Sequence, residues 1–145
     1  MNRGAYKQYN QVQIKTANRG KLIVMLYQGA IRFMKKAILH LEQKDMEGKG
    51  NALIRAQDII LELTYALDQQ LLEKGDELAV NLQRLYLYSY RRLVHANMRM
   101  EKEPIEEVIK LMENLLQAWE QVVQGEGGEP GGETPAASSG LVLTG

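Results

Sequence analysis

Apolar side chains recur every three or four residues along most of the chain, the spacing that places them on one face of an α-helix. The pattern divides into segments at about 18–44, 45–74 and 76–100. Each segment opens with Asn or Asp, which cap helix N-termini by accepting hydrogen bonds from the first backbone N–H groups. The three segments are therefore predicted to be three consecutive helices.

A fourth segment, 104–124, has the clearest amphipathic pattern. Glu103-Pro104 breaks the preceding helix, and Pro104 suits the first position of the next one, where no N–H is required. The apolar positions alternate in steps of three and four: Ile105, Val108, Met112, Leu115, Trp119 and Val122. These residues predict a fourth helix with one buried stripe.

Four helices joined by short turns predict an all-α fold, an antiparallel up-down four-helix bundle over residues 16–124. Residues 1–15 have mixed polarity and are predicted to form a short N-terminal arm or helix. Residues 125–145 are rich in Gly, Glu and Ser without apolar periodicity, which predicts a disordered C-terminal tail.

Length and composition narrow the class of protein. A chain of 145 residues fits one domain, and the absence of Cys excludes disulfides and Cys-ligated zinc. No apolar run approaches ~18 residues, so direct membrane insertion is not expected. Because residues 1–13 have no apolar secretion signal, the expected location is the cytoplasm.

The charges balance overall but are unevenly distributed. Eighteen basic and 18 acidic residues give a net charge of zero, which argues against a globally basic nucleic-acid binder. Residues 1–44 carry nine Lys or Arg against one Glu, and residues 104–145 carry one Lys against seven Glu. The two ends are expected to attract each other as neighbouring helices; a basic face for an acidic partner is the alternative.

The sequence has few residue patterns that are typical of catalytic or metal-binding sites. The only histidines are His40 and His95, and neither follows Glu at the three-residue spacing of di-iron bundles. No local pair of nucleophile and base is evident. We therefore predict no enzyme activity, no metal and no cofactor.

Several predicted helices carry apolar residues beyond one narrow stripe. The surplus includes Ile31, Met34, Ile54, Leu61, Tyr65 and Leu87. One interpretation is a thick core, since helices of globular proteins often bury a wide face. The other is a groove that accepts an apolar helix of a partner, and seven Met favour such an adaptable surface.

The most unusual stretch is 85–93, which reads LYLYSYRRL. Three Tyr within five residues cannot all face one core, and Tyr beside Arg is typical of interface hot spots. The residues of this strip are Tyr86, Tyr88, Tyr90, Arg91 and Arg92. Stacking on nucleic acid and a solvated face with buried rings remain alternatives.

Motifs in the four predicted helices resemble those of the flagellar secretion chaperones, the cytoplasmic flagellin-specific chaperones of bacteria. The resemblance extends from about Tyr6 to Val123. The motifs are Thr16-Ala17, the run LIVMLYQGA at 22–30, AQDII at 56–60, the Tyr/Arg pattern of 85–97, and Ala118-Trp119. Three positions depart from the usual pattern: the segment 19–21, Gln28 and Leu87.

This resemblance implies a chaperone that holds the disordered C-terminal segment of flagellin and prevents its premature polymerisation. It also implies delivery of that client to the membrane gate protein of the flagellar type III export apparatus. Family motif matches add Tyr27 and Asn97 to the candidate client-binding residues. Other flagellar regulators as partners, and a homodimer, are left open.

The N-terminal arm is a candidate gate. Tyr6, Tyr9 and Val12 lie in a segment too short to form its own core, and the resemblance suggests that it covers the client groove when the groove is empty. Two rival functions remain: a structural bundle that self-associates without a flagellin client, and a nucleic-acid binder that uses the basic N-terminal portion.

Overall fold

The computed structural model describes residues 19–128, with side chains through Gly125, and these residues form five helices without a strand. In chain order the helices are α2 (Arg19–Glu42), α3 (Met46–Tyr65), α4 (Gln69–Lys74), α5 (Glu77–Arg99) and α6 (Glu103–Gly128). The predicted arm, with Tyr6, Tyr9 and Val12, and the segment 129–145 lie outside the described residues.

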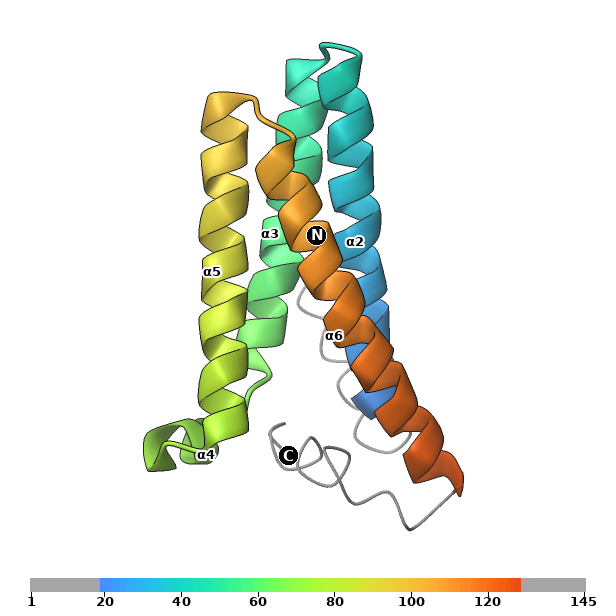
Figure 1. Cartoon of the computed structure of the whole chain (residues 1–145), viewed down its shortest axis with the longest axis vertical. Helices are drawn as coiled ribbons and strands as arrows, with labels where there is room; N and C mark the ends of the chain where they lie inside the picture. The colour runs from blue at the N-terminus through green and yellow to red at the C-terminus, as the bar shows by residue number, and fades with distance from the viewer. Residues whose placement is uncertain (1–18, 129–145) are drawn as a thin grey trace, which may run out of the picture.

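The four long helices form the predicted antiparallel bundle (Figure 1). Helix α2 packs against α3 and α6, and α5 also packs against α3 and α6. Helix α6 crosses the bundle obliquely, and the short α4 lies at the lower end of α5 (Figure 1). The all-α bundle predicted from periodicity is confirmed.

The second helix is shorter than predicted. Instead of continuing to Gly75, α3 ends at Tyr65 and a separate helix α4 begins at Gln69. The side chain of Asp68 accepts hydrogen bonds from the backbone N–H groups of Gln70 and Leu71, at 2.8 and 3.3 Å. Because an Asp in this position caps a new helix, the chain turns where apolar periodicity alone predicted continuity.

The predicted starts of α3 and α5 are confirmed, whereas α6 ends later than predicted. Asp45 and Asp76 cap α3 and α5, accepting hydrogen bonds of 3.0 Å from the N–H groups of Gly48 and Ala79. Helix α6 continues to Gly128 rather than ending at 124, so the first four residues of the predicted tail are helical.

The core draws on all four long helices. Its largest fully buried side chains include Tyr27, Met34, Leu53, Ile60, Tyr86, Leu93, Val108 and Met112. Helices α2 and α3 approach closely at Gly29, where an added Cβ would lie 3.3 Å from Cδ1 of Ile59. None of the described helices combines the length and the apolar composition needed to cross a bilayer.

The basic helix α2 and the acidic helix α6 are neighbours, as the charge pattern predicted. Lys35 Nζ of α2 lies 3.3 Å from a carboxylate oxygen of Glu113 on α6. A second pair has the opposite polarity: Lys102, just before α6, lies 3.5 Å from Glu42 at the end of α2. Both pairs are exposed, so each contributes at most ~1 kcal/mol and mainly helps to define the register of α2 against α6.

Candidate functional site

The structure separates the predicted Tyr/Arg strip into three environments. Tyr86 enters the core, Tyr88 and Arg92 turn toward α6, and the remaining strip residues lie elsewhere on α5. Successive residues of a helix point about 100° apart, so a run of nine residues must be distributed around the helix. The strip is therefore not one continuous binding surface.

Tyr27 and Tyr86 form a buried pair between α2 and α5. Their hydroxyl oxygens share a 2.5 Å hydrogen bond, and their ring centroids lie 6.3 Å apart at 54°. Both side chains are almost completely shielded from solvent. Neither of these two predicted client-binding side chains is exposed in this structure; they join α2 to α5 inside the bundle.

The buried pair makes the free energy of unfolding depend on pH in the alkaline range. Burial raises the pKa of Tyr86 to about 12 and raises that of Tyr27 well above its usual value, the charge of Tyr86 adding to the latter. In the unfolded chain both groups ionise near pH ~10. The folded state thus retains protons that the unfolded state releases, and the free energy of unfolding falls as pH rises from ~10 toward 12.

We expect urea denaturation between pH 9 and 11.5 to show this decline for the native protein. The Tyr27→Phe/Tyr86→Phe variant, which lacks both ionisable hydroxyl groups, should show a shallower decline. An equal slope in both proteins would indicate that other groups control the alkaline transition.

Tyr88 and Arg92 already have a partner within the protein. The Tyr88 hydroxyl and Arg92 Nε both donate hydrogen bonds to the carboxylate of Glu107 on α6, the second at 2.9 Å. The bond from Tyr88 is the main reason that the pKa of Glu107 is lowered, and it also raises the pKa of Tyr88. These contacts link α5 to α6 at the surface.

Exposed and half-buried apolar side chains lie along the seam between α3 and α5. Lys49 Nζ of α3 donates a 2.9 Å hydrogen bond to the carbonyl of Asn97 on α5, and a Cβ on Gly50 would lie 3.7 Å from Asn97 Oδ1. Because the helices are antiparallel, this register places Ile54 level with Val94, and Leu61 level with Leu87, to within about one helical turn.

We call this surface the α3/α5 face. Its members are Ile54, Leu61, Tyr65, Leu87, Tyr90, Val94 and Met98. Tyr65 and Met98 are the most exposed, at 71% and 76%, and Ile54 is half exposed. Tyr90 and Arg91 of the predicted strip, and the candidate Asn97, lie on or beside this face, by their helical spacing from Leu87 and Val94.

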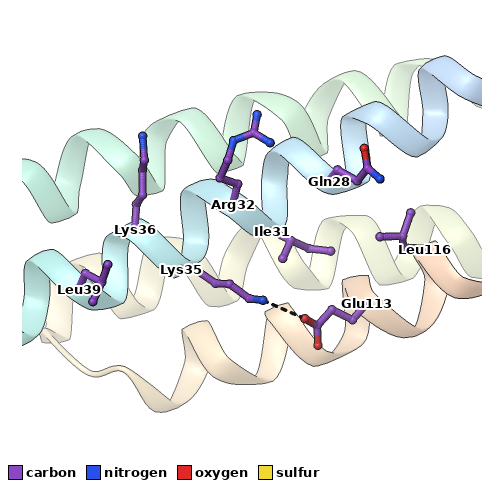
Figure 2. A pocket seen from close by; sticks show the side chains of 8 residues that line it. All are labelled: Gln28, Ile31, Arg32, Lys35, Lys36, Leu39, Glu113 and Leu116. Atoms are coloured by element: carbon purple, nitrogen blue, oxygen red, sulfur yellow. Dashed lines mark ion pairs between the residues drawn. The ribbon is translucent and has the colours of Figure 1, made fainter.

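A groove between α2 and α6 is a second surface, which the sequence did not reveal. It encloses about 500 Å³ and is lined by Gln28, Ile31, Arg32, Lys35, Lys36, Leu39, Glu113 and Leu116 (Figure 2). In Figure 2, Ile31 and Lys35 point toward α6, whereas Arg32 and Lys36 extend along the opposite side of α2.

Cations are concentrated beside this groove. The charged groups of Arg32, Lys36 and Arg55 lie 6.0, 5.7 and 5.4 Å from the centre of the Phe33 ring, within reach of cation–π attraction. Between residues 19 and 128, no cluster of three His, Cys, Asp or Glu side chains could hold a metal ion. What the described surfaces offer is apolar and basic contact area.

Comparison with known proteins identifies the family to which the chain belongs. The model of the family described as "Flagellar protein FliS" matches residues 1–126. The chain belongs to the FliS family. The flagellar secretion chaperone FliS of Salmonella typhimurium is 44% identical over 121 residues, 80% of this chain and 87% of the relative.

Relatives from other bacteria are also similar. FliS of Bacillus subtilis is 37% identical over 121 residues, covering 83% of this chain and 87% of its own. FliS of Campylobacter jejuni is 36% identical over 122 residues, covering 84% and 93%. The FliS match spans the whole bundle, and it confirms the family resemblance that the helix motifs indicated.

Proposed function

We propose that this FliS-family protein is a cytoplasmic, non-catalytic export chaperone that binds the disordered C-terminal segment of flagellin. Binding prevents premature polymerisation, and the complex delivers flagellin to the membrane gate protein of the flagellar type III export apparatus. The names of its relatives, all flagellar secretion chaperones, support this role. Other flagellar regulators are potential further partners of the remaining surfaces.

We propose the α3/α5 face as the main client-binding surface. The observation that carries this proposal is the concentration of exposed large apolar side chains on one seam: Ile54, Tyr65, Leu87, Val94 and Met98. Scattered apolar residues on a surface need no explanation, but a contiguous apolar stripe on a soluble domain is typical of a binding site. A bound client shields these apolar side chains from solvent.

The shape of the α3/α5 face suits an amphipathic helix. Its residues lie along two adjacent antiparallel helices, so a client helix can place apolar side chains at three- and four-residue spacing along the seam. Arg91 and Asp58, at exposed positions beside the apolar residues, offer charges of both signs to the polar edge of that helix. Tyr90 and Asn97 add polar groups at the same seam.

Folding on binding suits a chaperone that must release its client. A disordered segment loses conformational entropy when it folds onto a partner, which offsets part of the contact energy. The complex can therefore be specific because of its large contact area and still dissociate at the export gate.

A titration tests the proposed client directly. We expect a flagellin C-terminal peptide to gain helical circular dichroism when the full-length protein is added, with a negative heat-capacity change that reports apolar burial. A scrambled peptide of the same composition is the control. If the flagellin peptide gains no helicity and releases no heat, the proposed function is wrong.

We further propose that the N-terminal arm covers part of the α3/α5 face in the absence of client, through Tyr6, Tyr9 and Val12. Deleting residues 1–13 should then increase the association rate and the affinity for the flagellin peptide, because the arm no longer competes. Stopped-flow fluorescence of a labelled peptide measures both. A shortened protein with native association rate and affinity would argue against a gate.

Self-association through the same face is the competing interpretation. It predicts that light scattering gives the mass of a dimer or larger assembly, and that flagellin peptides have no effect on it. The chaperone proposal instead predicts that the peptide competes with any self-association, since both would use the same apolar side chains.

A further inference from the structure

The α2/α6 groove combines an apolar floor with cations that have no acidic partner nearby. Ile31, Leu39 and Leu116 supply the apolar lining, and Lys35 is neutralised by Glu113 at 3.3 Å. Arg32 and Lys36 form no ion pair with any acidic side chain in the described part of the chain. The groove therefore suits a segment that carries both carboxylates and apolar side chains.

The chain's own segment 129–145 has this chemistry. It carries Glu129 and Glu133 without any Lys or Arg, and it also contains the apolar run Leu141-Val142-Leu143. Residues 1–18 do not fit, because their charged residues are three cations and no acid. By charge, residues 129–145 therefore fit the basic groove, whereas residues 1–18 do not.

The charges of the two helices also direct this segment toward α2. Helix α6 contains six Glu and one Lys, so an acidic segment lying along α6 is repelled. Helix α2 contains five Lys or Arg and one Glu, and it forms the other wall of the groove. An acidic segment that leaves the end of α6 is therefore attracted across to α2.

The segment is long enough to reach the groove. The Lys35–Glu113 pair sets the register, which places Leu39 level with about residue 109 of α6, roughly 28 Å along the helix from Gly128. The stretch from Gly128 to Leu141 can extend up to about 43 Å. If it is flexible, its typical end-to-end distance is about 20 Å, close to the distance from Gly128 to Glu113.

Attachment to the bundle raises the effective concentration of this segment. A tether whose average length matches the span gives an effective concentration in the mM range. A contact with an intrinsic dissociation constant of about 1 mM would thus be occupied about half of the time. Even a small set of contacts in the groove is sufficient.

We infer that residues 129–145 dock intramolecularly into the α2/α6 groove, with Glu133 toward Arg32 and Lys36 and with Leu141-Val142-Leu143 on the apolar floor. The segment occupies a basic and apolar surface distinct from the α3/α5 face, and the inference does not depend on the proposed client.

Paramagnetic relaxation enhancement tests this inference. The chain has no Cys, so Thr144→Cys provides a single site for a spin label in the full-length protein. We expect the label to broaden the amide signals of Ile31, Lys35 and Leu39 strongly, and those of Ile54 and Val94 little. Broadening that is equal over the bundle, or concentrated at Ile54 and Val94, would overturn the inference.

Charge variants test the proposed contacts. Arg32→Glu/Lys36→Glu should reduce the broadening of groove signals to the level of the α3/α5 face, whereas Lys74→Glu/Arg84→Glu, with the same change in net charge, should leave it unchanged. Glu133→Gln should give the same loss without altering the bundle. If this last variant retains full broadening, or if broadening grows with protein concentration, intramolecular docking through these charges is refuted.

Discussion

Replacing Leu87 and Val94 with Asp should lower the affinity for the flagellin C-terminal peptide by about 100-fold, equivalent to ~2.7 kcal/mol. Both side chains are on the α3/α5 face and already partly exposed, at 38% and 36%. Two carboxylates placed against an apolar client helix would lose their hydration without gaining partners. Isothermal titration calorimetry of the Leu87→Asp/Val94→Asp variant measures this change.

The matched control is Met25→Asp/Leu39→Asp on α2, where the side chains are 64% and 58% exposed. These substitutions add the same charge to exposed apolar positions away from the α3/α5 face, so affinity should change less than about threefold, or ~0.7 kcal/mol. Circular dichroism establishes that both variants are folded. A folded test variant with native affinity would exclude this face as the client surface.

The buried tyrosine pair gives the second large effect. Tyr27→Phe or Tyr86→Phe alone should lower the free energy of unfolding by about 1–3 kcal/mol, because each leaves the other hydroxyl without its partner in the core. The double variant should lose less than the sum of the single losses, since both polar groups are removed together. Urea denaturation at pH 7 measures all four proteins.

A conservative control separates the pair from a general effect of losing a hydroxyl. Tyr65→Phe, at an exposed position of α3, should change the free energy of unfolding by less than ~0.5 kcal/mol. Strictly additive losses at Tyr27 and Tyr86 would mean that the two hydroxyl groups do not stabilise the bundle through each other.

Periodicity and capping residues were sufficient to predict the bundle, because each long helix has an apolar stripe at helical spacing, and α3 and α5 begin at Asp side chains that cap them. The break at Asp68 was not predicted, because apolar residues continue at helical spacing on both sides of it. Only the hydrogen bonds that the Asp68 carboxylate accepts show that a separate helix begins there.

The distribution of the Tyr/Arg strip could not be derived from the sequence. Helical spacing separates the side of α5 that carries Tyr88 and Arg92 from the side that carries Leu87 and Val94. Which side faces α6 and which faces α3 depends on the handedness of the bundle, a property of the packed helices together. The Glu107 contacts and the Lys49–Asn97 bond decide it.

The surplus apolar residues divide between the core and the surface. Ile31 and Met34 are buried and thicken the core, whereas Ile54 and Leu87 remain exposed on the α3/α5 face. The α2/α6 groove was missed because its lining depends on the register of two helices far apart in the chain.

Methyl NMR of the full-length protein with labelled Ile, Leu and Val tests the central claim most directly. On addition of the flagellin C-terminal peptide, we predict large shifts for the methyl groups of Ile54, Leu61, Leu87 and Val94, and small shifts for those of Leu39 and Leu116. Shifts centred on Leu39 and Leu116, or no shifts at saturating peptide, would contradict client binding on the α3/α5 face.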